Sequence, residues 1–369
     1  MKHGWDYKKL GDLCDIYQPK TLATEQLVAD GKYYVYGANG IIGRYNDYNH
    51  EQSEILLTCR GATCGTINIS QPYSWINGNA MVIHRKSEDL SFDFLKYLML
   101  SLDYSLIITG AAQPQITRQK IAPIIVKFPS LSVQQSIVSE LDKINELIRL
   151  KKEQLKDYDN LAQSIFYEMF GDPVVNEKGW EKKRLGEVCS EIKYGTSKPA
   201  CDNGKYKYLR MCNLSYDGYL DLTDIKRIDV SDEEIEKCIV RYGDILFNRT
   251  NSHELIGKTC MFDQQEPMVI AGYIIRVRLT KELMPQVLAR MFNLASIKKL
   301  LRSMAKGAVN QANINSKELA SIQIPIPSLD LQQHFVKRIE LIEQQKAEIQ
   351  STIADLETLL ASRMQYWFG

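Results

Sequence analysis

Apolar residues gather in short runs along residues 1–131 and again along residues 172–328. The runs are YYVYG, EILLT, GTINIS, NAMVIHR and IIVKFP in the first region, and KYLRM, DILFN, KTCMF, YIIRVRL and SIQIPIP in the second. Short runs rich in β-branched and aromatic residues predict strands, whereas the spacing in SFDFLKYLMLSL predicts a helix. Each region is therefore predicted to be a mixed domain of the α/β (α+β) class.

A different pattern fills residues 132–171 and 329–369, where apolar residues recur every three or four positions. Such heptads predict two long helices that pair along an apolar seam, with Lys151 and Lys346 interrupting the rows. The predicted seam residues are Ile137, Leu141, Ile144, Ile148, Leu155 and Ile165 in the first helix, and Phe335, Ile339, Ile342, Ile349, Ile353, Leu356 and Leu360 in the second.

The starts of both predicted helices carry the same signals. Pro129 and Pro327 end the preceding strands. Ser132 with Gln135, and Asp330 with Gln333, have the spacing of capping boxes.

These similarities belong to an internal repeat that runs through the whole chain. FPSLSVQQSIV at 128–138 resembles IPSLDLQQHFV at 326–336, and WDYKKLGDLC near the start resembles WEKKRLGEVC at 180–189. SEILLTCRG at 53–61 resembles GDILFNRTN at 243–251, GAAQPQI resembles GAVNQANI, and FG recurs at 170–171 and 368–369. The chain is thus predicted to contain two copies of one unit, a mixed domain followed by a long helix.

Two copies suggest an arrangement for the four segments, which are residues 1–131, 132–171, 172–328 and 329–369. We expect two antiparallel helices that separate the domains and relate them by a pseudo-twofold axis. The alternative is that each helix packs only on its own domain.

The composition and charge of the chain disfavour several classes of protein. A formal net charge of +1 disfavours nucleic-acid binding by bulk electrostatics alone. No signal-peptide pattern or run of roughly 20 apolar residues is present, so we expect a cytoplasmic protein without a membrane segment. The eight cysteines include no CxxC pair, which favours free thiols, and Cys59 and Cys64 are interpreted as ordinary thiols rather than zinc ligands. No metal site is predicted.

Motifs that carry chemistry are missing from the sequence. We find no GxxxxGK[ST], HExxH, GxSxG, NPPY or DPPY stretch, and GANGIIG at 37–43 is interpreted as a turn. We therefore predict a chain with no catalytic residues. Two alternatives stay open: a nuclease built from scattered carboxylates, and a protein-binding scaffold with duplicated domains.

The ordered repeat resembles the specificity subunit of type I restriction-modification systems. The resemblance rests on the W-x4-LG-x2-C openings, the GDIL-like strands, the G-x-x-Q-x-x-I ends, the P-S-L helices and the FG termini. It implies two target-recognition domains that read a bipartite double-stranded DNA sequence, and helices that dock two methyltransferase subunits, with restriction/translocase subunits bound indirectly. It also implies that S-adenosylmethionine and ATP bind to partner subunits and not to this chain.

Side chains that form paired hydrogen bonds with bases are the candidates for reading DNA. Arg60 and Arg249 are the first choices because each follows an equivalent strand, and Lys205, Lys207 and Arg210 are predicted phosphate contacts. The other candidates are Asn39, Arg44, Thr63, Gln113, Gln115 and Arg118 in the first copy, and Asn248, Asn251, Asn310, Gln311 and Asn313 in the second.

Overall fold

The computed structural model describes residues 5–110, 113–308 and 311–369 of the chain. Its contacts divide the chain into two compact units. Unit 1 contains Met1–Lys152 with Ser351–Gly369, and unit 2 contains Glu153–Gln350. Each unit holds one mixed domain and one half of each long helix, α4 (Leu131–Phe170) and α9 (Leu329–Phe368).

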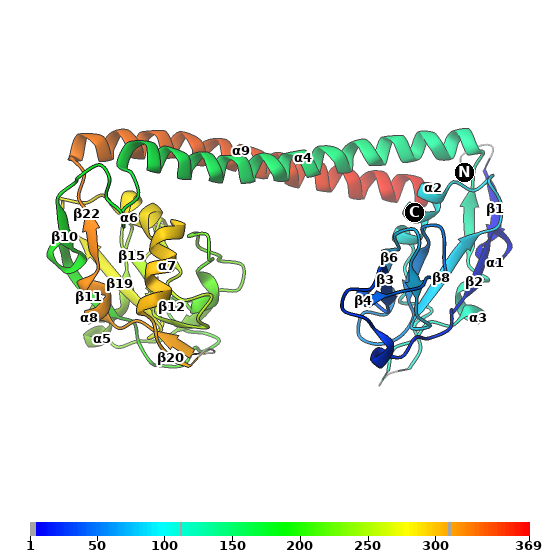
Figure 1. The fold of residues 1–369 in the computed structure, drawn as a ribbon, viewed down its shortest axis with the longest axis horizontal. Coiled ribbons are helices and arrows are strands. Elements are labelled where there is room, and N and C mark those ends of the chain that lie inside the picture. The colour runs from blue at the N-terminus through cyan, green and yellow to red at the C-terminus, as the bar shows by residue number, and fades with distance from the viewer. Residues whose placement is uncertain (1–4, 111–112, 309–310) are drawn as a thin grey trace. The chain divides into compact units, whose positions relative to one another are not determined.

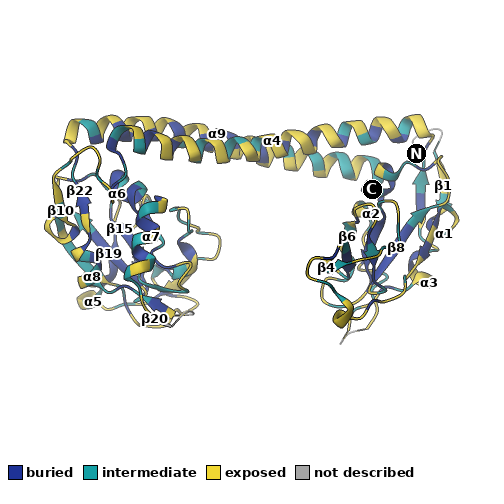
Figure 2. Ribbon diagram, in the orientation of Figure 1, coloured by how far each residue is buried: buried dark blue, intermediate teal, exposed yellow. Residues whose placement is uncertain are grey.

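Unit 1 is built around a four-stranded antiparallel sheet with the order β2-β8-β5-β6. Every residue of the inner strand β5 is buried. Figure 2 shows buried residues in the strands of both domains. A second sheet, β4-β3-β7, and the pair β1-β9 complete the domain. The elements are β1 (Asp6–Lys9), α1 (Leu10–Leu13), β2 (Cys14–Tyr17), η1 (Thr24–Gln26), β3 (Tyr33–Gly37), β4 (Gly40–Tyr45), β5 (Ile55–Thr58), β6 (Ile67–Ile69), β7 (Trp75–Ile76), β8 (Ala80–Arg85), α2 (Phe92–Ser101), α3 (Arg118–Ile121) and β9 (Ile125–Phe128).

Unit 2 has the same plan with additions. Its main sheet has the order β11-β19-β15-β17, and further sheets are β13-β12-β18-β14, β16-β21-β20 and β10-β22. The elements are β10 (Lys182–Arg184), η2 (Leu185–Val188), β11 (Cys189–Tyr194), β12 (Tyr206–Leu209), η3 (Met211–Asn213), β13 (Lys226–Ile228), α5 (Asp232–Cys238), β14 (Ile239–Val240), β15 (Ile245–Asn248), β16 (Thr250–Asn251), β17 (Thr259–Met261), β18 (Met268–Ile270), β19 (Ile274–Leu279), α6 (Pro285–Phe292), α7 (Ala295–Met304), β20 (Lys306–Ala308), β21 (Gln311–Asn313), α8 (Ser316–Ser321) and β22 (Gln323–Pro325).

The predicted elements are confirmed. Each of the strand-like runs named above contains a strand, and the predicted helix at 91–102 is α2. The glycine-rich stretch at 37–43 forms a β-hairpin between β3 and β4, where Gly40 has φ of +108°. The mixed α/β class is therefore correct for both domains.

The two long helices pair antiparallel within each unit. In unit 1, Glu140 of α4 contacts Arg363 of α9, and Lys152 further along α4 contacts Glu357. In unit 2, Asp159 contacts Lys346, and Phe166 stacks edge-on against Phe335 at 5.5 Å. Position along α9 falls as position along α4 rises, as the heptads predict.

The predicted seam is buried along most of its length. Only Leu155, Leu356 and Leu360 retain intermediate exposure. Each domain also packs on both helices. In unit 1, Ile137 and Leu141 of α4 belong to the core cluster, and Leu360 of α9 packs against that cluster. In unit 2, Ile165 of α4 and Phe335 of α9 belong to one core cluster. The alternative in which each helix packs only on its own domain is therefore wrong.

The predicted capping boxes are wrong. The helices begin at Leu131 and Leu329, so Ser132 and Asp330 already lie inside the first turn. The first glutamine of each Gln-Gln pair is instead fully buried and hydrogen-bonded to the domain. Gln134 accepts a hydrogen bond from the Ser91 amide (2.8 Å) and donates to the carbonyls of Asp89 and Pro129 (both 2.9 Å).

Gln332 repeats this arrangement in unit 2. It accepts from the Met284 amide (2.8 Å) and donates to the carbonyls of Glu282 and Pro327 (both 2.9 Å). In both units the glutamine ties the strand-to-helix corner to the loop before α2 or α6.

A second link between domain and helix differs between the units. In unit 1 the Tyr97 hydroxyl of α2 donates to Asp142 (2.6 Å) and accepts from the Asn145 amide (2.9 Å) of α4. In unit 2 the guanidinium of Arg290 on α6 forms an ion pair with Glu343 of α9. Asn145 and Glu343 occupy equivalent positions of the two helices. The link at this position is a neutral hydrogen bond to Tyr97 in unit 1 and an ion pair with Arg290 in unit 2.

Lys346 does not simply interrupt the seam. Its side chain is buried and donates to the Asp159 carboxylate (2.5 Å) and the Tyr219 hydroxyl (2.6 Å). The hydrogen bonds to these groups hold the pKa of Lys346 above its usual value despite the opposing effect of burial. Within unit 2 this lysine joins both helices to the domain.

Candidate nucleic-acid interface

The loop that follows β5 in unit 1 is held against the segment at 113–116. The Ile116 amide donates to the Cys59 carbonyl (3.0 Å), and the Gly61 amide donates to the Pro114 carbonyl (3.0 Å). Gln115 forms β-bridges with Arg60 on one side and Thr109 on the other. Thr109, Gln115 and Arg60 therefore form a row across three adjacent segments.

Unit 2 builds the same row from a regular sheet. The Ile314 amide donates to the Arg249 carbonyl (2.9 Å), and Asn313 of β21 pairs with Thr250 of β16 and Lys306 of β20. β20 lies at the end of unit 2 away from α4 and α9 (Figure 1). The row Lys306, Asn313, Thr250 corresponds to Thr109, Gln115, Arg60, and the basic residue has moved from one edge to the other.

The two arginines chosen from the sequence are not equivalent. The backbone bonds match Cys59 with Arg249, and Arg60 with Thr250. Neighbouring residues in extended chain point to opposite faces, so the two side chains leave their strands differently. Both arginines follow equivalent strands, β5 and β15, as predicted, but Arg249 comes one residue after its strand and Arg60 two.

The candidate side chains of unit 1 converge at the end of β5. Arg60, Thr63, Gln113 and Gln115 are exposed in and beside the row, and Arg118 is exposed at the start of α3. Asn39 approaches from the β3–β4 turn, because the Thr58 hydroxyl donates to the neighbouring Ala38 carbonyl and the Asn68 amide lies 3.4 Å from the Asn39 oxygen.

Arg44 does not join this group. It lies near the other end of the hairpin, where its guanidinium donates to the Gly31 carbonyl (3.1 Å) and lies over the Tyr34 ring at 4.4 Å. This position favours a role in holding the hairpin.

In unit 2 Arg249 is held in place by two neighbours. Its Nε donates to the Asn313 side chain (3.0 Å), and its guanidinium lies over the Tyr194 ring at 4.8 Å. The Thr250 hydroxyl donates to the same Asn313 oxygen (3.0 Å). Asn251 is half-buried next to them, and Gln311 is exposed on β21.

Four further predicted DNA-contacting residues lie in different environments. Asn248 is 0% exposed at the end of β15, which excludes direct contact with a base in this conformation and corrects its assignment. Lys207 and Arg210 are already paired with the carboxylates of Glu266 (2.6 Å) and Asp224 (2.7 Å), which weakens both as phosphate contacts. Lys205 is exposed.

Asn310 lies outside the described residues.

Two residues of the site were missed from the sequence. Thr250 takes the place that Arg60 has in unit 1, and the alignment of SEILLTCRG with GDILFNRTN already paired them. Tyr194 lies beneath Arg249 and accepts a hydrogen bond from the Ser316 amide (2.8 Å). No local pattern in the sequence connects Tyr194 to Arg249, because 55 positions separate them.

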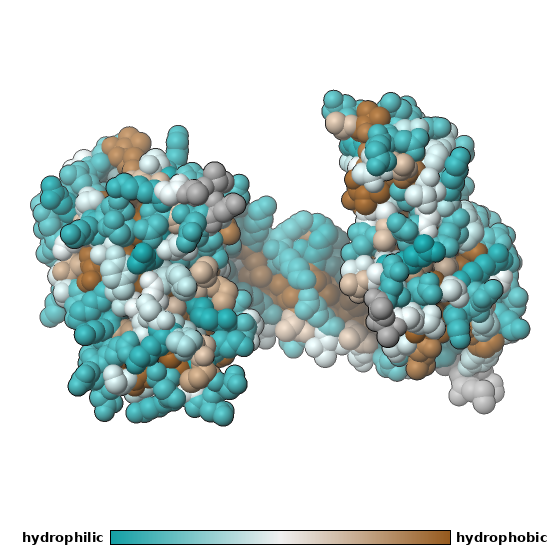
Figure 3. Space-filling model, turned by 90° about the horizontal axis from the view of Figure 1, so that it is seen from below, coloured by the Kyte–Doolittle hydropathy of each residue, from teal (hydrophilic) through white to brown (hydrophobic). Residues whose placement is uncertain are grey.

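The face in Figure 3 is mainly hydrophilic in both units, with hydrophobic side chains in small separate groups. Within the described ranges, no group of three His, Cys, Asp or Glu side chains could hold a metal ion. Burial raises the pKa of the Cys59 thiol, and Cys59 donates to the Asn79 carbonyl (3.2 Å). No helix of the described chain is long and apolar enough to cross a bilayer.

The chain thus contains two copies of one fold, and each copy carries polar side chains on the same three-segment row. The family model for the type I restriction modification DNA specificity domain matches residues 2–157 and 177–357. The chain therefore belongs to the family of type I restriction-modification DNA specificity proteins.

Curated relatives agree with this assignment, and a solved structure shares the fold. The EcoKI specificity subunit of Escherichia coli K12 is 25% identical over 232 residues, which cover 58% of this chain and 50% of that protein. The MjaVIII specificity subunit of Methanocaldococcus jannaschii is 22% identical over 371 residues, covering 92% of this chain and 86% of that one. A structure from work on complex assembly and conformational transition of the type I R-M system has the same fold, with a TM-score of 0.61, 20% identity, and coverage of 99% and 97%. The chain spans 38–56% of the length of the first four curated relatives it matches.

Proposed function

We propose that the chain is the non-catalytic specificity subunit of a type I restriction-modification complex and that each unit reads one half of a bipartite DNA target. The observation that carries this proposal is the matching row in the two units. The backbone pairing joins corresponding residues in both, whereas the side chains are Thr109, Gln115 and Arg60 in one and Lys306, Asn313 and Thr250 in the other. A conserved backbone with exchanged side chains suits two readers of different sequences.

The chemistry of the rows fits base recognition. The hydrogen bond to Asn313 uses Nε of Arg249 and does not involve its two terminal nitrogens. These terminal nitrogens can donate to O6 and N7 of guanine. Gln115 and Gln311 are exposed amides of the kind that pairs with adenine. Bidentate contacts of this kind discriminate against a wrong base by roughly 1–3 kcal/mol each.

The test is selection from random duplex DNA with this chain copurified with the methyltransferase subunit of its system. Enrichment of two short specified blocks around an unspecified gap is the expected result. A stable complex that enriches no motif would contradict DNA reading and favour the protein-binding scaffold. Cleavage of DNA by the purified chain alone with a divalent metal would instead favour a nuclease.

The proposal includes two copies of one methyltransferase subunit, and the helices suggest where they dock. Aligned through the repeat, α4 and α9 share five residues that are exposed in both: Leu131/Leu329, Gln135/Gln333, Asp157/Asp355, Leu161/Leu359 and Ser164/Ser362. Most other exposed positions differ. Exposed identity is expected where both helices meet the same partner.

Two of these shared residues, Gln135 and Leu359, line one groove of unit 1. In unit 1 a groove of about 690 Å³ is lined by Gln135 and Ile144 of α4 and by Leu359 of α9. Gln333, Ile342 and Leu161 are the corresponding residues of unit 2. We propose that each unit receives one methyltransferase subunit here, with an apolar side chain of the partner covering the leucine.

Native mass spectrometry of the copurified complex tests this docking. Leu359→Glu and Leu161→Glu should each reduce the bound methyltransferase subunits from two to one, and the double variant should bind none. Leu150→Glu is the matched control, because Leu150 is exposed on α4 and the repeat already has Glu348 in its place. Retention of two partners by the double variant would contradict the proposed groove.

Cofactor chemistry is assigned to the partners. In this proposal S-adenosylmethionine binds to the methyltransferase subunits, and ATP binds to restriction/translocase subunits that join through them. The complex acts on cellular DNA, which agrees with the cytoplasmic location expected from the sequence.

A further inference from the structure

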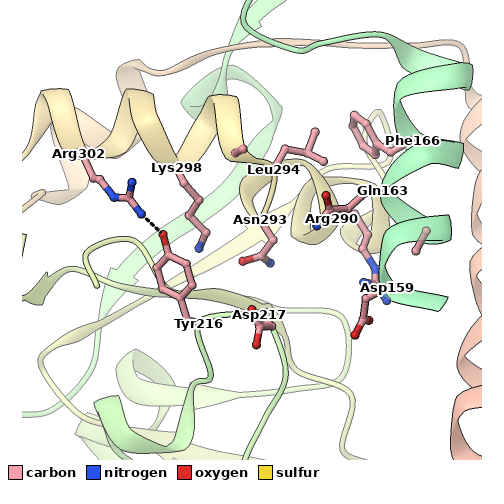
Figure 4. A pocket seen from close by; sticks show the side chains of 12 residues that line it. Asp159, Gln163, Phe166, Tyr216, Asp217, Arg290, Asn293, Leu294, Lys298 and Arg302 are labelled. Carbon is pink, nitrogen blue, oxygen red and sulfur yellow. Dashed lines mark hydrogen bonds between the residues drawn. The ribbon is translucent and has the colours of Figure 1, made fainter. Parts of the chain in front are cut away.

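Unit 2 contains a cavity of about 350 Å³ that is separate from the proposed DNA-reading row. Its walls come from α4, α6, α7 and the turn at Tyr216 and Asp217, as Figure 4 shows. In unit 1 the described segment that follows α2 forms no helix corresponding to α7. The cavity therefore belongs to the second domain and not to the duplicated framework.

Lys298 of α7 places a buried charge at this cavity. Its side chain is 4% exposed, donates to the Gly257 carbonyl (2.9 Å) and lies over the Tyr216 ring at 4.7 Å. No carboxylate of the described chain forms an ion pair with it. Burial lowers the pKa of Lys298 to about 8. The charge of Asp217 partly opposes this effect but forms no ion pair with Lys298. A buried cation without an ion-pair partner is costly, so an anion in the adjoining cavity would relieve the cost.

Neighbouring side chains offer further unused hydrogen-bonding atoms. Arg302, one turn along α7, donates to the Tyr216 hydroxyl, while its buried Nε has no partner among the described residues. The Asn293 amide donates to the carbonyls of Thr259 and Ala289 (both 2.8 Å), which fixes its orientation. Its buried Oδ1 has no partner in the described chain.

The other charges around the cavity are largely satisfied. Arg290 is paired with Glu343, and Asp159 accepts from Lys346. Asp217 is exposed at the turn. The cavity thus combines two cations without carboxylate partners, Lys298 and Arg302, with one free acceptor on Asn293.

We propose that this cavity binds a small phosphate ester of mononucleotide size, with Lys298 and Arg302 holding the phosphate and Asn293 Oδ1 accepting from a donor group of the ligand. The volume lies within the range of small-molecule sites. Arg302 supplies planar donors and Lys298 a point charge, a pairing suited to phosphate oxygens.

Isothermal titration of the full chain with inorganic phosphate, adenosine monophosphate and guanosine monophosphate tests the site. We expect saturable binding that is tighter for a nucleotide than for phosphate, and at least tenfold weaker in Lys298→Met and in Arg302→Gln. Lys299→Met is the matched control, since Lys299 is the exposed neighbour on the same helix. Hydrogen exchange of α7 verifies that each variant is folded.

Three outcomes would overturn the proposal. They are no binding of any probe by the folded wild-type chain, equal binding by Lys298→Met and Lys299→Met, and protection of Lys298 from acylation by duplex DNA but by none of the three probes. The last would identify the anion as the DNA backbone. Because no DNA selection is involved, failure here leaves the proposed specificity function untouched.

Discussion

Replacing Gln134 by alanine should loosen unit 1 at one defined corner. The side chain is 0% exposed and makes three hydrogen bonds of 2.8–2.9 Å, to the Ser91 amide and to the carbonyls of Asp89 and Pro129. Each hydrogen bond contributes about 1 kcal/mol net, and a buried group left without a partner costs about 1–3 kcal/mol. We expect Gln134→Ala to lower the free energy of unfolding of unit 1 by about 3 kcal/mol.

The assay is thermal unfolding combined with hydrogen exchange read by mass spectrometry. For a unit of this size, about 3 kcal/mol corresponds to a fall in Tm of roughly 6–12 °C. Exchange should accelerate most in the peptide that contains Ser91, because its amide loses the acceptor. Gln332→Ala should do the same at Met284 in unit 2.

Gln135→Ala is the control, because Gln135 is the exposed member of the same pair. A second variant, Gln134→Glu, keeps an acceptor for Ser91 but cannot donate to the two carbonyls, so it should be no more stable than Gln134→Ala. The reasoning fails if Gln134→Ala and Gln135→Ala unfold alike, or if exchange accelerates evenly across unit 1.

Three other predictions concern charged side chains. Lys346→Ala should lower the free energy of unfolding of unit 2 by about 2 kcal/mol, as measured by chemical unfolding. Lys346→Met should lower it by less than about 1 kcal/mol, because an apolar residue of similar length fills the seam and the partly exposed Asp159 carboxylate can be hydrated. Lys298 has a pKa of about 8 when folded and 10.5 as its ordinary value. Between these two pH values the unfolded chain therefore binds more protons than the folded chain. The contribution of Lys298 to the free energy of unfolding should rise by about 3 kcal/mol from pH 8 to pH 10.5. The difference between wild type and Lys298→Met across that range measures it, and a constant difference would contradict it. Arg60→Ala and Arg249→Lys should each relax one half-site only in DNA selection, by roughly 1–3 kcal/mol at one base pair; simultaneous loss of both half-sites in a folded variant would refute the assignment.

The strands and helices of this fold could be predicted from the sequence, because each depends on local periodicity. Ile137, Leu141 and Ile144 are buried as their heptad spacing predicts. The ordered repeat then predicted two copies of one unit, which no single motif could have indicated.

The polar contacts were harder to predict, because their partners are distant in sequence. Spacing drew attention to Gln135 as a capping residue, yet the buried, bonded glutamine is Gln134, whose partners at 89–91 lie more than 40 positions away. Asn248 has the chemistry of a base-reading residue but is buried at a strand end. Side-chain type indicates what a residue can bind, and only the tertiary fold decides whether it is reachable.

The unlike links between domain and helix limit how recognition domains can be exchanged. Tyr97 of the first domain needs Asn145, and Arg290 of the second needs Glu343, yet both partners lie several turns inside the following helix. A chimera joined at Pro129 or Pro327 would place Tyr97 beside Glu343, or Arg290 beside Asn145. An exchange that preserves both links has to include the helix as far as Asn145 or Glu343, so the exchanged segment is longer than the mixed domain alone.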